Sequence, residues 1–115
     1  MLANNQKQPK LAVPTKHGTI FVEEEEILFC KASGSYTNIY LENKSMLIIA
    51  KSLRKVHEAF PLGIFIRIHN SHIVNSHHIV GYSMNGQSSV TLTDGTILSV
   101  SRNRKKSFFE QYRII

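Results

Sequence analysis

The sequence has little of several things that whole classes of protein require. Its 115 residues include a single cysteine, Cys30, so neither an intrachain disulfide nor a thiolate cluster for a metal can form, as expected in a reducing cytosol. No stretch approaches the ~20 apolar residues that are needed to cross a bilayer. The N-terminus also lacks an apolar run long enough for a secretory signal. These absences predict a soluble, cytoplasmic protein without a membrane partner.

Acidic residues are scarce as well. There are 8 Asp and Glu against 14 Lys and Arg, a formal net charge of +6. Residues 44–115 carry ten Lys or Arg but only three acidic side chains, whereas Glu23–Glu26 form one acidic run, which we interpret as a solvated turn facing away from nucleic acid. A basic surface attracts polyanions, since each neutralised phosphate releases counterions. A surface made basic for solubility is the alternative, and charge alone leaves both open.

The chain length suits one domain with one modest core. Residues 1–16 contain eight polar side chains and two prolines, which predicts a flexible leader or linker. We therefore expect the folded domain to cover residues 17–115.

Short runs of β-branched and aromatic residues, separated by turn residues, dominate this domain. They predict a mainly β fold of small antiparallel sheets. Asp94-Gly95 is a strong hairpin signal, because the turn needs a positive φ that glycine adopts freely. The predicted strands are Thr19–Val22, Ile27–Ala32, Tyr36–Leu41, Met46–Ala50, Ile64–His69, Ile79–Ser83, Ser89–Thr93 and Thr96–Val100.

One or two short helices complete the predicted fold. Ser52 can cap the first helix, which buries Leu53, Val56 and Phe60 and ends at Pro61. A C-terminal helix follows Ser101 and has two faces. Its predicted core-facing stripe is Phe108, Tyr112 and Ile115, and its cationic side is Arg102, Lys106 and Arg113.

Four of the six histidines fall within residues 69–78, namely His69, His72, His77 and His78. In an extended chain their side chains diverge, and no cysteine pair, HExxH spacing or nearby carboxylate supplies further ligands, so we predict no metal site. A nucleophile elbow and a glycine-rich phosphate loop are also missing from the sequence. We therefore predict neither an enzyme nor a cofactor. We interpret His72, His77 and His78 as exposed residues without a role.

Polar and cationic residues in the predicted loops suit nucleic acid. The amide of Asn70 offers a donor and an acceptor side by side to a base edge, and Arg102 and Arg104 offer paired donors of the geometry that suits guanine. Lysines could grip phosphates and fix the register without sequence preference. The lysines predicted for this role are Lys44, Lys51, Lys105 and Lys106.

Four segments resemble the LytTR DNA-binding domain of bacterial response regulators. They read I-L-F-C-K-A-S-G-S-Y-T-N-I-Y-L (27–41), S-L-R-K-V (52–56), F-I-R-I-H-N-S-H-I-V-N (65–75) and L-T-D-G-T-I-L-S-V-S-R (92–102). The match runs from about Thr19 to Tyr112. The pairing of R-x-H-N-S-x-x-V-N with a downstream D-G-x-x-L-x-V-S-R is more specific than either piece.

The resemblance implies a compact β fold of antiparallel sheets that contacts double-stranded DNA through loops, as a transcription regulator of a two-component system. It implies that two copies bind paired promoter repeats, and that the domain belongs either to a stand-alone regulator or to a longer chain with a receiver domain. The implied contact positions are the loop near Ser35 and Tyr36, the turn of His69, Asn70 and Ser71, and Arg102.

For some residues the sequence leaves two interpretations open. Arg67 could form a structural ion pair or contact a phosphate, and His69 could satisfy a buried turn or contact a base. Asn75 is interpreted as fixing backbone groups locally rather than reading DNA, as asparagine often does in turns. The alternative function is a non-enzymatic β module whose exposed strand edges bind a protein partner or make a homodimer.

Overall fold

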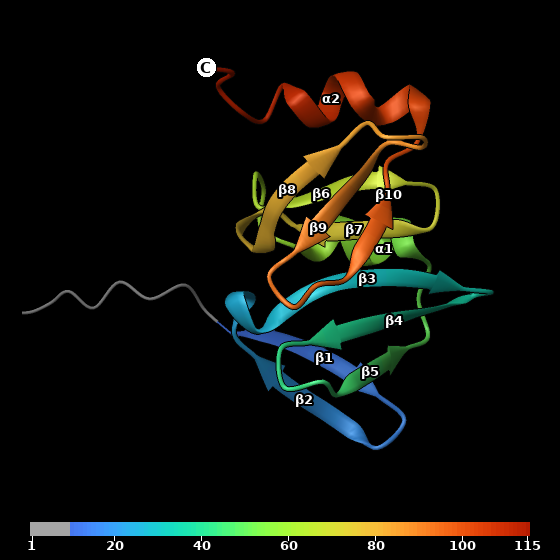
Figure 1. The fold of residues 1–115 in the computed structure, drawn as a ribbon. Helices are drawn as coiled ribbons and strands as arrows, with labels where there is room; N and C mark the ends of the chain where they lie inside the picture. Colours follow the sequence, from blue (N-terminus) through green and yellow to red (C-terminus); the bar gives the residue numbers. More distant parts are fainter. Residues whose placement is uncertain (1–9) are drawn as a thin grey trace, which may run out of the picture.

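The structure is a computed structural model that describes residues 10–115 (Figure 1). These residues form strands in three antiparallel sheets and two short helices, which confirms the predicted fold class. The helices are α1 (Leu53–Ala59) and α2 (Lys105–Phe109). The strands are β1 (Leu11–Thr15), β2 (Gly18–Val22), β3 (Ile27–Ser33), β4 (Tyr36–Leu41), β5 (Met46–Ile49), β6 (Phe65–His69), β7 (His72–Asn75), β8 (Ile79–Ser83), β9 (Ser89–Leu92) and β10 (Ile97–Ser99).

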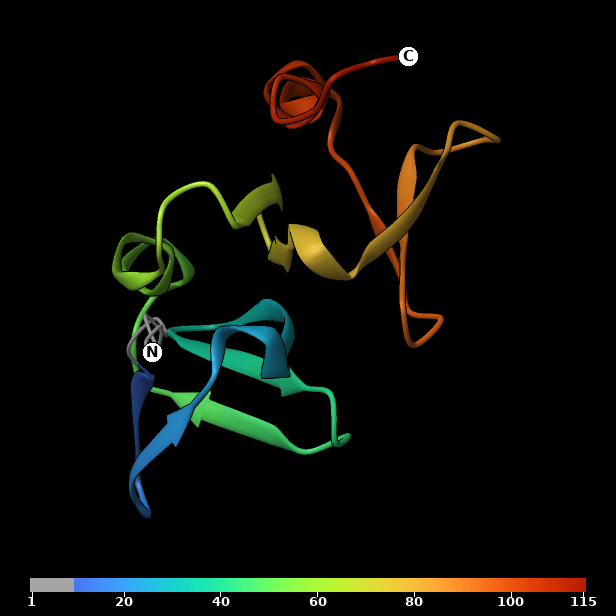
Figure 2. The same ribbon diagram turned by 90° about the vertical axis from the view of Figure 1, so that its left-hand side faces the viewer.

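A five-stranded sheet, in the order β5-β4-β3-β7-β6, forms the centre of the molecule. Hairpin β1–β2 and helix α1 lie on one side, and the three-stranded sheet β10-β9-β8 lies on the other, as the blue and orange parts of Figure 2 show. Within residues 10–115, three short 3-10 helices connect the strands: η2 (Glu24–Glu26), η3 (Ser76–His78) and η4 (Arg102–Arg104).

The central sheet is buried on both faces, so the domain has two hydrophobic cores. Successive strand residues point to opposite faces, and in β7 Ile73 enters the first core, beside α1 and β1–β2, while Val74 enters the second, beside β8–β10 and α2. In β3, Cys30 likewise enters the first core and Phe29 enters the second. Burial raises the pKa of the Cys30 thiol, which therefore acts as inert packing.

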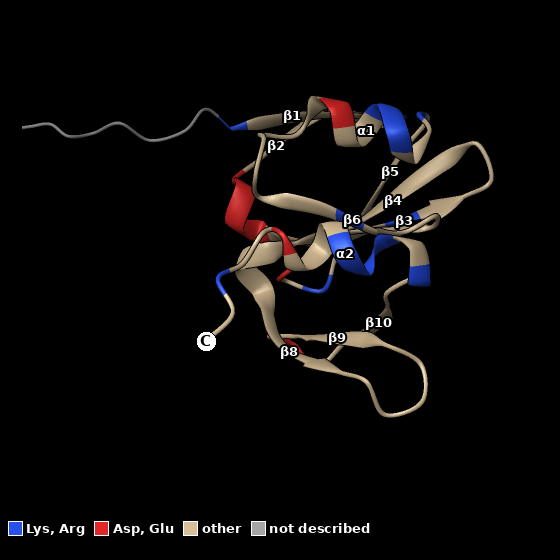
Figure 3. Ribbon diagram, turned by 90° about the horizontal axis from the view of Figure 1, so that it is seen from above, with Lys and Arg blue, Asp and Glu red and all other residues tan. Residues whose placement is uncertain are grey.

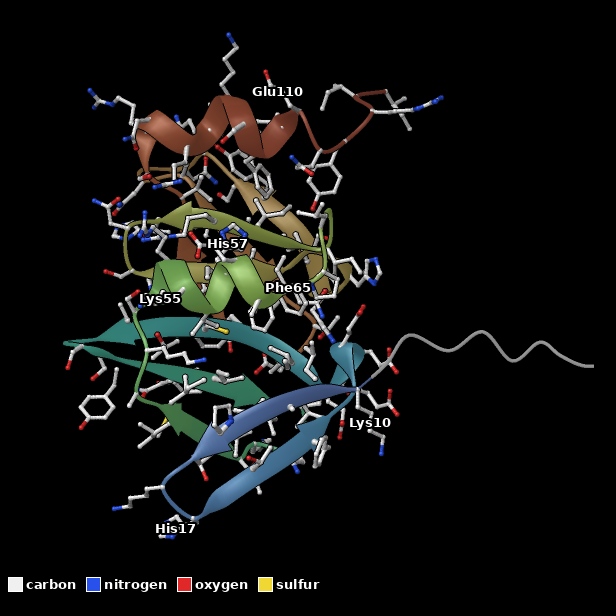
Figure 4. All side chains as sticks on the ribbon, turned by 180° about the vertical axis from the view of Figure 1, so that it is seen from behind. Lys10, His17, Lys55, His57, Phe65 and Glu110 are labelled. Atoms are coloured by element: carbon white, nitrogen blue, oxygen red, sulfur yellow. The ribbon has the colours of Figure 1, made fainter. Side chains whose placement is uncertain are left out.

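Helix α1 forms as the sequence predicts. The Ser52 Oγ accepts a hydrogen bond from the Lys55 N–H at 3.3 Å and caps the helix, and Leu53 and Val56 are buried. His57 on α1 forms a 2.9 Å hydrogen bond through Nε2 to the Phe65 carbonyl and so ties the helix to β6 (Figure 4).

The predicted leader over residues 1–16 is wrong in its second half. Leu11–Thr15 forms β1, which pairs with β2 across a turn in which Gly18 has φ +113°. Val13 and Val22 from the two strands are buried in the first core, and their burial stabilises the hairpin. The folded part therefore begins before His17, and residues 1–9 lie outside the described residues.

The predicted stripe of the C-terminal helix holds only at its start. Phe108 is buried, but α2 ends at Phe109, Tyr112 is 40% exposed and Ile115 is fully exposed. The chain leaves the helix through the hydrogen bonds Gln111 N–H to Phe108 O and Tyr112 N–H to Phe109 O. These i,i+3 bonds end the 3.6-residue period on which the predicted stripe depends.

Candidate nucleic-acid interface

Four segments that are distant in the sequence meet at one end of the molecule, on the right in Figure 1. The β6–β7 turn joins β3 through a 2.9 Å hydrogen bond from the Ala32 N–H to the Ser71 carbonyl. The chain after β10 joins β6 through a 2.8 Å bond from the Ser101 N–H to the Ile68 carbonyl. The chain after β5 joins β4 through a 2.8 Å bond from Thr37 Oγ1 to the Lys51 carbonyl. We call this surface the loop end.

The β6–β7 turn is held by its own side chains. Arg67 donates from Nε to the His69 carbonyl at 2.9 Å and from Nη2 to the Asn70 carbonyl. The ring of His69 accepts at Nδ1 from the Ser71 N–H at 3.1 Å, so the neutral ring carries its proton on Nε2. These bonds fix the backbone of Asn70, whose side chain is exposed. The turn interpretation of His69 is thereby supported, and the ion-pair interpretation of Arg67 is wrong.

Arg102 lies beside this turn. Ser101 binds β6 through its backbone, its Oγ donates to Asn103 Oδ1 at 3.0 Å, and its carbonyl accepts from the Arg104 N–H at 3.0 Å. These bonds start the 3-10 helix η4 at the loop end and leave the Arg102 side chain exposed. The Ser101–Ile68 bond thus brings the segments of Arg102 and Asn70 together, and both side chains face solvent.

The positive charge of the loop end is not neutralised by neighbouring carboxylates. Within residues 10–115 the contacts of 4.0 Å or less between basic and acidic side chains are Arg54–Glu58 and His78–Glu42. Figure 3 shows basic residues on β3, β6 and the start of α2, with the acidic η2 on another side. An anion can therefore approach the loop end without displacing an internal partner. The predicted cations placed here are Lys51, Arg102, Arg104, Lys105 and Lys106.

Lys44 lies at the opposite end, in the β4–β5 turn. The Glu42 N–H donates to the Glu26 carbonyl at 2.8 Å and brings this turn against η2. Hydrogen bonds from Thr96 lower the pKa of the Asp94 carboxyl, and the charge of Lys44 contributes to the same shift. Lys44 thus lies among acidic residues, and the structure does not bring it together with the other predicted contacts.

Tyr36 and Ser71 complete the predicted set. Tyr36 begins β4 beside the turn at Gly34, which has φ +60°, and its side chain is 50% exposed at the loop end. Ser71 is half-buried, since its carbonyl is bound by β3 and its N–H by His69.

Lys31 and the β8–β9 loop also lie near the loop end, although neither was predicted from the sequence. Lys31 is exposed opposite His72 in the β3–β7 register. Alternation along β3 was the available signal for Lys31, because its neighbour Cys30 faces the first core. A cleft of about 670 Å³ lies between the central sheet and β8–β10. Its lining residues are Phe29, Lys31, Tyr40, His72, Asn85, Gln87, Ser88, Ser89, Ile97, Leu98 and Ser99.

Two histidines are not exposed as the sequence predicted. His72 is half-buried, and burial, followed by the charges of His69 and Lys31, lowers its pKa to about 4, so the ring is neutral at pH 7. His78 is buried between η2 and the β9–β10 hairpin, where Nε2 is 2.7 Å from the Glu25 carbonyl and Nδ1 is 2.9 Å from Thr93 Oγ1. His77 is exposed. None of residues 10–115 form a group of three or more His, Cys, Asp or Glu able to hold a metal.

The fold and the cations of the loop end define a class of protein, namely small β domains whose loops can bind a polyanion. Residues 17–113 match the family model described as the LytTr DNA-binding domain. The chain therefore belongs to the LytTr family of DNA-binding domains, which serve transcription regulators such as response regulators.

Among the solved structures that match this fold, one has a TM-score of 0.77 and 23% sequence identity, and the match covers 90% of this chain and 96% of that chain. It is the LytTr DNA-binding domain of a Bacillus cereus protein described as a methyl-accepting/DNA response regulator. No curated protein matches the chain. Among the described residues, no helix is long and apolar enough to span a membrane.

Proposed function

We propose that the domain binds DNA sequence-specifically as part of a cytoplasmic bacterial transcription regulator, and that Asn70 and Arg102 read base edges in the major groove. The observation that carries this proposal is the Ser101–Ile68 hydrogen bond, which brings together the two backbone segments from which these exposed side chains project. An amide suits adenine and a guanidinium suits guanine, because each presents two hydrogen-bonding groups in the matching geometry.

The other residues of the loop end have supporting roles in this proposal. Lys51, Lys105 and Lys106 contact phosphates, which hold the domain in register without reading sequence. Tyr36 flanks the reading residues with a half-exposed ring, while His69 and Ser71 shape the turn of Asn70. Lys44 has no role in the proposal.

We propose further that two copies bind direct repeats in a promoter, and that a receiver domain controls the domain in a longer chain. Both proposals rest on family membership. Selection from a random duplex pool tests the first, because paired binding would enrich two copies of one motif at a fixed spacing. Enrichment of single motifs would contradict it.

Arg102→Ala tests the reading role. Bidentate recognition of one base pair is worth about 1–3 kcal/mol, so the variant should lose that much affinity for the selected duplex and relax its preference at one position. Affinities for selected and random duplexes are measured at several salt concentrations, with Arg113→Ala, an exposed arginine beyond α2, as the control. Equal losses on both duplexes would contradict base reading by Arg102.

A further inference from the structure

Two half-buried arginines, Arg67 and Arg104, lie together at the base of the β6–β7 turn. Arg67 is in β6 and Arg104 ends η4, which contacts β6 and is joined to it by the Ser101–Ile68 hydrogen bond. Burial, and then the charge of Arg104, lower the pKa of Arg67, as expected for two like charges side by side. Neither guanidinium has a carboxylate within 4.0 Å among residues 10–115.

Both guanidinium groups keep donors that no acceptor in residues 10–115 binds. A guanidinium has five N–H donors, and Arg67 uses one on Nε and one on Nη2 for the carbonyls of His69 and Asn70. The Nε of Arg104 is buried and has no hydrogen-bond partner among the described residues. An anion that joins two like charges with spare donors stabilises the pair, because the anion supplies both opposite charge and acceptors.

We propose that Arg67 and Arg104 together bind one phosphodiester group of the DNA backbone. This inference rests on the proposed function and changes the role of Arg104, which the sequence indicated as a reader of guanine. A base reader must project into the groove, whereas Arg104 is half-buried and its Nε is buried. A phosphate presents several acceptor oxygens and can bridge two guanidinium groups.

The site also links phosphate binding to base reading. Arg67 holds the Asn70 carbonyl, so an anion that fixes Arg67 also fixes the turn from which the Asn70 side chain projects. Arg67 is a positioning residue for Asn70 as well as a phosphate ligand, and its replacement would disturb both roles. Arg104 makes no hydrogen bond to the turn, so the experiments replace Arg104 rather than Arg67.

The first test compares Arg104→Gln with Arg104→Lys in the full chain. Arg104→Gln should weaken binding to selected and random duplexes by the same several-fold factor and reduce the salt slope by about one. Arg104→Lys keeps the charge and should keep the slope. A loss confined to the selected duplex would make Arg104 a base reader and overturn the proposal, as would unchanged binding to both. If the wild type binds DNA without sequence preference, the proposed function is refuted, but the phosphate contact of Arg104 can still be tested on random duplexes.

The second test locates the anion. Selected duplexes that carry one neutral methylphosphonate at successive positions are titrated with wild type and with Arg104→Gln. One position should weaken wild-type binding and leave the variant unaffected, since the variant has already lost that contact. If every position weakens both proteins equally, the phosphate site is wrong. Inorganic phosphate at constant ionic strength is the free-anion probe, and it should raise the melting temperature of wild type more than that of Arg104→Gln. Equal rises would overturn the two-arginine site.

Discussion

Asn70 and Asn75 lie five residues apart and have opposite environments. Asn70 is exposed, and its backbone is fixed by Arg67. Asn75 is fully buried; its Nδ2 donates to the carbonyls of Glu24 at 3.1 Å and Ile27 at 2.9 Å, and its Oδ1 accepts from the His77 N–H at 2.9 Å. One amide therefore remains available for a partner, while the other joins η2, β3 and η3.

Asn75→Asp should unfold the domain more easily. An ionised carboxylate has no donor, so two buried carbonyls lose their partner and face a negative charge. We expect a loss of about 3 kcal/mol or more in the free energy of unfolding, measured by urea denaturation at pH 7. Asn85→Asp makes the same chemical change in an exposed loop and should stay within ~0.5 kcal/mol. Similar stabilities of the two variants would contradict the structural role of Asn75.

At the residue scale, the sequence could indicate the chemical type of each side chain but not the groups that surround it in the fold. The interpretation of Asn75 as a residue that fixes backbone groups locally was correct for its bond to the His77 N–H, but wrong for the other two bonds, which reach residues 51 and 48 positions away. The partners of Arg67 and the burial of His78 depend on contacts between elements, which no local pattern reveals. The proposed roles of Asn70 and Arg102 came from their chemistry and from the family resemblance, and they stay predictions.

At the element scale, the sequence predicted most strands and helix α1 close to their observed limits. The signals were the alternation of apolar and polar residues in the strands and the capping residue of the helix. Two strands were missed. β1 is short and contains Pro14, and the packing of Val13 in the first core identifies it. β7 is four residues long and buried on both faces, so it lacks the period of two that marks a half-exposed strand.

The β9–β10 hairpin forms at Asp94-Gly95 as predicted. Gly95 has φ +91° and donates its N–H to the Leu92 carbonyl at 2.9 Å, and the Asp94 carboxylate accepts from the Thr96 N–H at 3.0 Å. Gly95→Ala should cost about 1 kcal/mol of unfolding free energy, because alanine is strained at this φ. Gly81→Ala is the control, since Gly81 has neither a positive φ nor an atom within 4 Å of an added Cβ. Thermal melts that show equal losses would contradict the argument.

At the scale of the whole molecule, charge is separated between two ends. The loop end carries unpaired cations, while the other end carries η2, Glu42 and Asp94 together with Lys44. The sequence showed an excess of Lys and Arg after residue 44 but could not show which turns share an end. That grouping follows from strand direction and from long-range bonds such as Ala32–Ser71.

Charge reversal of two lysines tests this separation. Lys51→Glu and Lys44→Glu change the net charge equally, but Lys51 belongs to the loop end and Lys44 to the acidic end. The described residues extend 42 × 41 × 24 Å, whereas the screening length in 0.1 M salt is about 10 Å. A charge at the far end therefore has little effect on a DNA phosphate at the loop end.

Lys51→Glu should weaken binding to selected and random duplexes by roughly tenfold or more near 0.1 M salt, because a phosphate contact is replaced by repulsion. Lys44→Glu should change both affinities by less than about twofold, since only screened long-range attraction is lost. Fluorescence anisotropy over a salt series measures both, and urea denaturation verifies that each variant is folded. Equal weakening would mean that DNA responds to net charge alone, and a stronger effect of Lys44→Glu would place DNA at the acidic end.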